Sequence, residues 1–179
     1  MRIPAATMPR SDGRAFWRRH ASVMALVAPG ALFAAGMALL GQSNRFAWLR
    51  SPATFRWQIW AIALFGIVAT VAGFLDHRLH LRLGAKVGPK ERRVELAALV
   101  LGGLPLFALM AVATVTHSRA LLGPVIAQTL VVAGLVLYDE LRFHTRRCGG
   151  YETVLHRVLV FGQAGALLAW MHLCFVAPL

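Results

Sequence analysis

The chain has few acidic residues, few charged residues of any kind and only two cysteines. Its 179 residues include 7 Asp and Glu, and 15% are charged, whereas a soluble domain ordinarily has about 25%. Cys148 and Cys174 form no Cys-x-x-Cys pair, so the sequence offers no cysteine motif for metal or redox chemistry. The shortage of charge argues against an ordinary soluble domain.

Apolar residues are abundant instead. They make up 58% of the chain, and the mean hydropathy is +0.63. Several almost uncharged runs are about long enough to cross a bilayer as a helix. In chain order these runs are Ala21–Leu40, Trp57–Leu75, Leu96–Thr116, Ala120–Tyr138 and Val154–Val176. The sequence therefore predicts an all-α polytopic membrane protein, a bundle of five transmembrane helices.

We expect two parts along the chain. Residues 1–20 are a basic tail, and residues 21–179 form a single five-helix transmembrane domain. A basic start before an apolar run is also typical of a signal peptide. Because this run is about a full bilayer span, we interpret it as a retained first helix.

Positive charge is unevenly distributed among the predicted loops. Of the 19 Lys and Arg, five lie in the tail, six after the second span and four after the fourth. Five spans place these three segments on one side, which the positive-inside rule makes cytoplasmic. We expect an inner-membrane protein of a bacterium, with a cytoplasmic N-terminus, a C-terminus on the opposite side and cytoplasmic helix extensions. The net charge of +12 is thus explained by orientation, and we expect no nucleic-acid partner.

Carboxylates and histidines gather on that same side at a repeated spacing. Asp76 and His80 are four residues apart, and Glu91–Glu95, Glu140–His144 and Glu152–His156 repeat this interval. Residues four apart lie on one face of a helix. Carboxylate with imidazole suits iron, manganese or zinc, and helical bundles build dinuclear sites from such residues. The candidate metal ligands are Asp76, His77, His80, Glu95, Glu140, His144, Glu152 and His156.

One short segment resembles a known family. His77-Arg78-Leu79-His80 is similar to the core of a His-x-x-His-His box of membrane fatty-acid desaturases and hydroxylases, with Leu81 in place of the last histidine. The resemblance covers four residues, and the chain has no second box of this kind. Four residues are too few to assign the chain to that family, and we infer the reaction type from the class of candidate ligands alone.

Several functions remain open from the sequence. The first is a membrane metalloenzyme, a di-iron oxygenase or hydroxylase that acts on a lipid-like substrate and uses an electron donor. The second is a non-catalytic subunit that contacts membrane lipids or membrane-protein partners, its polar residues forming a solvated rim. The third is a b-type haem protein with His80 and His156 as axial ligands. We also expect a hydrogen bond between Gln128 and Gln163 inside the bundle.

Overall fold

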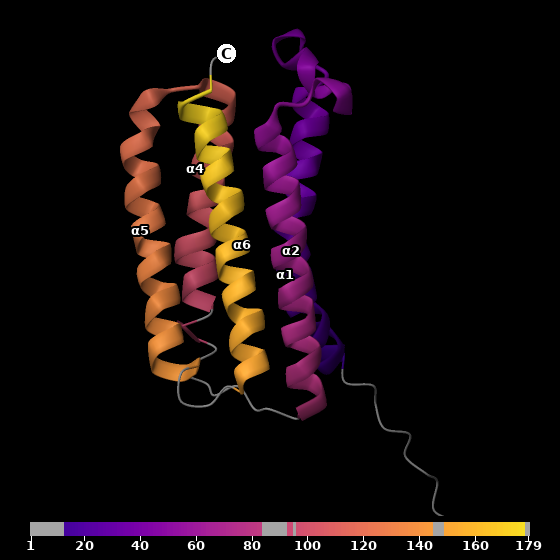
Figure 1. Ribbon diagram of the computed structural model, residues 1–179, viewed down its shortest axis with the longest axis vertical. Coiled ribbons are helices and arrows are strands. Elements are labelled where there is room, and N and C mark those ends of the chain that lie inside the picture. The colour runs from indigo at the N-terminus through magenta and orange to yellow at the C-terminus, as the bar shows by residue number, and fades with distance from the viewer. Residues whose placement is uncertain (1–12, 84–92, 95, 145–148, 178–179) are drawn as a thin grey trace, which may run out of the picture.

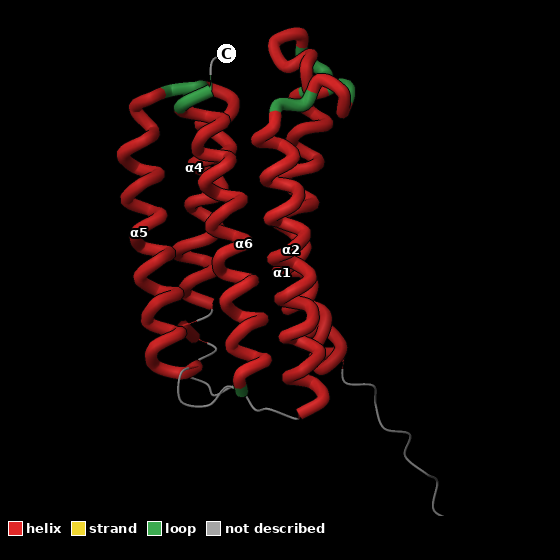
Figure 2. The backbone as a smooth tube through the Cα atoms, viewed as in Figure 1, coloured by secondary structure: helices red, strands yellow, loops and turns green. Residues whose placement is uncertain are grey.

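A computed structural model of the chain describes residues 13–83, 93–94, 96–144 and 149–177; of residues 13–23, 83 and 143–144 it describes the backbone alone. These residues are almost entirely helical (Figures 1 and 2). The elements are α1 (Gly13–Leu40), η1 (Asn44–Leu49), η2 (Pro52–Thr54), α2 (Trp57–Leu83), η3 (Ala98–Gly103), α4 (Leu104–Thr116), η4 (Arg119–Leu121), α5 (Leu122–Asp139), η5 (Glu140–His144) and α6 (Gly150–Phe175). Turns η1, η2 and η4 are 3₁₀, whereas η3 and η5 are π-helical.

The prediction of an all-α fold is confirmed for the described residues, and their apolar helices support a membrane bundle. Within the described ranges, four helices are long and apolar enough to cross a membrane: Trp57–Arg82, Ala98–Thr116, Arg119–Arg142 and Gly150–Phe175. The described apolar part of α1, Met24–Leu40, is shorter, so the count of five spans stays a prediction. Helix α1 also begins at Gly13, inside the segment 1–20 interpreted as a tail. Residues 14–20 include no proline and three arginines, a composition that favours a helix.

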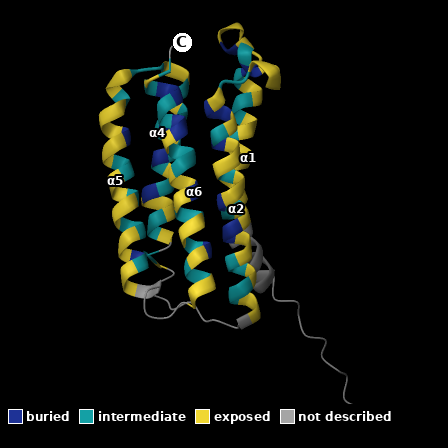
Figure 3. Ribbon diagram, in the orientation of Figure 1, coloured by how far each residue is buried: buried dark blue, intermediate teal, exposed yellow. Residues whose placement is uncertain are grey.

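The outward faces of the helices are apolar and exposed (Figure 3). Phe161 in α6 and Leu130 in α5 are 72% and 67% exposed, respectively. Exposing this many large apolar side chains to water is energetically unfavourable, whereas such a helix surface is well suited to contact with lipid chains. The exposed apolar belt and the helix lengths together support insertion into a membrane.

Helix α6 lies between α2 and α4 and makes its closest approach to α2 (Figure 1). A Cβ added at Gly162 would be 3.0 Å from both the Ala69 Cβ and the Phe65 carbonyl oxygen. One turn later, a Cβ at Gly165 would be 2.9 Å from the Phe65 ring. Small residues let two membrane helices pack backbone to backbone, where van der Waals contact replaces the hydrophobic effect. Gly162 therefore fixes how closely α2 and α6 approach.

A polar side chain of α5 replaces a backbone hydrogen bond that is missing near the start of α4. Pro105 has no N–H, so it cannot donate to the Leu101 carbonyl as a regular helix residue would. The Gln128 Nε2 donates instead to the carbonyls of Leu101 at 2.6 Å and Gly102 at 3.1 Å. The expected bond between Gln128 and Gln163 is wrong, because the nearer acceptors are these backbone carbonyls, and Gln163 is exposed.

Gly162→Ala should lower the thermal stability of the detergent-solubilised protein by about 1–3 kcal/mol, since the new methyl group overlaps backbone atoms of α2. The matched control is Gly134→Ala in α5, because a Cβ there meets nothing within 4 Å. That variant should gain about 0.5–1 kcal/mol from helix propensity. Thermal unfolding followed by circular dichroism measures both. Equal stabilities of the two variants would contradict the close α2–α6 approach.

Candidate metal site

Three elements bring carboxylates and histidines together at one end of the bundle. We call this the polar end: the last two turns of α2, the η5 turn and the first two turns of α6 (Figure 1). Here α6 starts at Gly150, after Gly149 in an extended conformation, and Glu152 lies in its first turn. A carboxylate is stabilised there by the positive end of the helix dipole. His80 lies in the last turn of α2, where the negative end of the helix dipole favours a cation.

The main group consists of Asp76, His80 and Glu152. The Nε2 atom of His80 lies 2.7 Å from the Glu152 Oε1, and its Nδ1 lies 3.5 Å from the Asp76 Oδ2. One imidazole of α2 thus stands between a carboxylate of its own helix and a carboxylate of α6. The three side chains are between 12% and 22% exposed, so they are sheltered and still accessible from the membrane surface.

A second pair lies beside this group. The His156 Nε2 is 3.2 Å from the Glu140 Oε2. Glu152 and His156 are one turn apart on α6, so this helix gives one ligand type to each group. Glu140 opens the π-helical turn η5, and such turns shift the direction of the side chains that follow and are frequent at functional sites. Asp139, the preceding residue, is only 8% exposed.

The main group comes close to the geometry that a divalent ion requires. Its three donor atoms all lie within 4.8 Å of one another. Ligand atoms stand about 2.0–2.2 Å from zinc or a similar ion, so two donors on one ion are at most about 4.4 Å apart. Modest side-chain rotations would satisfy this limit. Two carboxylate oxygens and one imidazole nitrogen suit iron, manganese or zinc.

The other predicted ligands lie elsewhere or outside the described residues. His77 is half-buried on α2 and belongs to neither group. It directly follows Asp76, and successive residues of a helix point about 100° apart. His144 is the last residue of η5, and the structure describes its backbone but not its side chain. Glu91 and Glu95 lie outside the described residues. The structure therefore brings Asp76, His80 and Glu152 together, and separately Glu140 with His156.

Pairing between helices is the feature that sequence reasoning missed. The four-residue spacing predicted contacts within helices, and Asp76 with His80 is one. The two shorter contacts, His80 with Glu152 and Glu140 with His156, join different helices. Comparison of the chain with protein-family models, with curated proteins and with solved structures found no match in any of the three.

His80 and Glu152 should be energetically coupled. In a double-mutant cycle with His80→Ala and Glu152→Ala, measured in chelator, we expect a coupling free energy of unfolding of about 1 kcal/mol, as for a sheltered charged hydrogen bond. Unfolding in a denaturing detergent series gives the four stabilities. The matched cycle of His77→Ala with Glu152→Ala should be additive within about 0.5 kcal/mol. Coupling of similar size in both cycles would contradict the direct contact.

Proposed function

We propose that the chain is an integral membrane metalloprotein with its metal centre at the polar end. The finer proposal is a di-iron oxidoreductase of the oxygenase or hydroxylase type that acts on a lipid-like substrate. One observation carries the coarser statement: Asp76, His80 and Glu152 from two helices place three donor atoms within 4.8 Å. A solvated rim of unrelated polar residues requires no such convergence between two helices.

A dinuclear centre is favoured by the second pair. Glu140 and His156 repeat the carboxylate–imidazole combination, and Glu152 and His156 share one face of α6. Carboxylate and histidine ligands on facing helices are the pattern of bundle di-iron proteins. In this proposal Asp76, His80 and Glu152 hold one ion, and Glu140 and His156 belong to the other.

The chain's own residues set the conditions of the chemistry. When bound, a pair of iron ions would supply the activation of oxygen. The two helices joined by His80 and Glu152 keep the ligands in register, and the partial burial of the carboxylates limits water around them. The exposed apolar faces of α5 and α6 offer an approach for an acyl or isoprenoid chain from the bilayer. Oxygenase chemistry also requires an electron donor as a partner.

The proposed orientation agrees with this placement. In the sequence, most Lys and Arg belong to the N-terminal segment and to the connections after the second and fourth predicted spans, so the positive-inside rule would put that side in the cytoplasm. The protein would lie in a bacterial inner membrane with its C-terminus on the other side. A soluble cytoplasmic reductant could then reach the centre.

The test is metal content and absorption of protein purified in detergent from metal-replete cells. We expect bound iron in the wild type and its loss in Glu152→Gln, which removes the anionic ligand but keeps an amide able to hydrogen-bond His80. The matched control His77→Asn removes a histidine next to Asp76 and should retain the metal. A wild type without metal, or full metal in Glu152→Gln, would overturn the proposal and favour a non-catalytic subunit. A strong Soret band would favour haem instead.

The number of ions tests the dinuclear part separately. We expect two ions per chain in the wild type and about one in Glu140→Gln, since the second pair loses its carboxylate while the main group remains intact. Quantitative elemental analysis against protein concentration measures the ratio. One ion in both proteins would retain a metalloprotein but remove the di-iron centre.

A further inference from the structure

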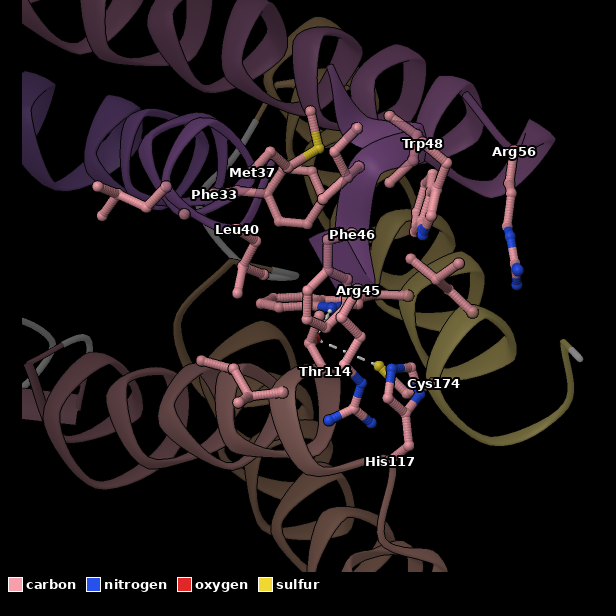
Figure 4. Close-up of a pocket in the computed structure, with 18 of the residues that line it drawn as sticks. Phe33, Met37, Leu40, Arg45, Phe46, Trp48, Arg56, Thr114, His117 and Cys174 are labelled. Atoms are coloured by element: carbon pink, nitrogen blue, oxygen red, sulfur yellow. Dashed lines mark hydrogen bonds between the residues drawn. The ribbon is translucent and has the colours of Figure 1, made fainter. Parts of the chain in front are cut away.

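A pocket lies at the other end of the bundle, which we call the hairpin end: residues 41–56 and 117–121 with the helix termini beside them. Its volume is about 370 Å³, and it is walled by α1, η1, α4 and α6 (Figure 4). The walls are mainly apolar, and include Phe33 and Met37 of α1 and Phe107 and Ala111 of α4. This volume is at the lower end of the range for small-ligand pockets.

Cationic and hydrogen-bonding groups stand at one end of this pocket. Arg45 and His117 extend to the same end (Figure 4), and both contact Phe46. The Arg45 guanidinium carbon is 5.5 Å from the centre of the Phe46 ring, and the His117 ring stacks on Phe46 at 6.0 Å. Arg56 also lines the pocket, with its guanidinium 5.1 Å from the Trp48 ring centre.

The local field favours an anion. Burial lowers the pKa of His117 below its usual value, and the charges of Arg45 and Arg56 lower it further. The imidazole is therefore neutral at neutral pH and offers an N–H without adding charge. His117 also has a left-handed backbone with φ 52°, which ends α4 and turns the chain sharply into η4. Held this way, its ring lies against Phe46 beside Arg45.

No carboxylate side chain balances this charge. None of the residues that line the pocket is Asp or Glu, and the sequence has no acid in residues 13–75, 96–138 or 153–179. Within the described ranges, neither the Arg45 guanidinium nor the His117 Nε2 has a hydrogen-bond acceptor. Arg50 is different: it donates to the Gly41 carbonyl at 2.8 Å and the Asn44 Oδ1 at 3.1 Å, and so closes the loop.

We propose that this pocket binds one anionic phospholipid, with an acyl chain between α1 and α4 and its phosphate at Arg45 and His117. Guanidinium is well suited to phosphate because its planar N–H groups donate in pairs. The depth is appropriate, since Trp57 and Trp60 are exposed at this end, and tryptophan marks the level of lipid head groups. The pocket volume accommodates one chain, and the other stays in the bilayer.

This site is separate from the proposed metal centre. Asp76 follows Arg56 by 20 positions, nearly all of them in α2, and a helix rises about 1.5 Å per residue, so the two sites are about 30 Å apart. The lipid proposal therefore does not rest on the proposed metal chemistry, and either can fail alone.

Native mass spectrometry of delipidated protein, titrated with a phosphatidylglycerol or with a phosphatidylcholine of the same chains, tests the proposal. We expect tighter binding of the phosphatidylglycerol and a loss of about five- to tenfold in its affinity in Arg45→Gln. Arg119→Gln is the matched control, because Arg119 is exposed at the same end but does not line the pocket. It should bind like the wild type.

A second variant tests the chain-binding part with the charges intact. Ala111→Phe fills the pocket from α4 and should weaken binding of phosphatidylglycerol to a similar extent. If Arg45→Gln fails to fold, Ala111→Phe still tests whether the pocket binds the lipid. Equal affinity for the two lipids, equal losses in Arg45→Gln and Arg119→Gln, or unchanged binding in Ala111→Phe would each overturn the proposed site.

Discussion

The close packing of α2 against α6 is the contact on which the rest of the structure depends. Gly162 lets the α6 backbone approach Phe65 and Ala69 of α2 with no room for a methyl group. Where hydrophobic driving force between helices is absent, such contact supplies much of the association energy. The His80–Glu152 hydrogen bond joins the same two helices at the polar end. Packing in the apolar middle thus determines which polar groups meet at the membrane surface.

The distribution of acids gives the two ends of the bundle different chemistry. Each Asp and Glu that the structure describes lies at or next to the polar end, whereas the described part of the hairpin end has arginines and His117 without them. Carboxylates next to imidazoles can hold a cation. Arginines in an apolar setting without carboxylates attract an anion. The distribution of acidic residues therefore underlies both proposals, although one ligand is a cation and the other an anion.

The helices were predictable from the sequence because apolar runs of membrane length are a strong signal. The second span was expected to continue past Leu75, and α2 does end at Leu83. The site was predictable only in part. Spacing placed Glu152 and His156 on one face of α6, but it could not reveal that they pair with different neighbours, because that depends on how each helix is rotated. The pocket was missed since Arg45 and His117 lie in connections that were interpreted only as loops.

The separation of the two sites constrains any function that uses both. A phospholipid whose phosphate lies at Arg45, at the hairpin end, cannot present its head group to Asp76 and His80, because the length of α2 separates the two ends by about 30 Å. A substrate of the metal centre would have to approach the polar end directly, along the exposed faces of α5 and α6. A lipid at the hairpin end would act instead on packing, because Phe33 and Phe107 of its pocket both contact the Trp170 ring. Trp170 belongs to α6, the helix that also carries Glu152 and His156. The lipid would therefore be linked to the proposed metal centre through the position of α6, and also through Ile59 of α2, which lines the pocket.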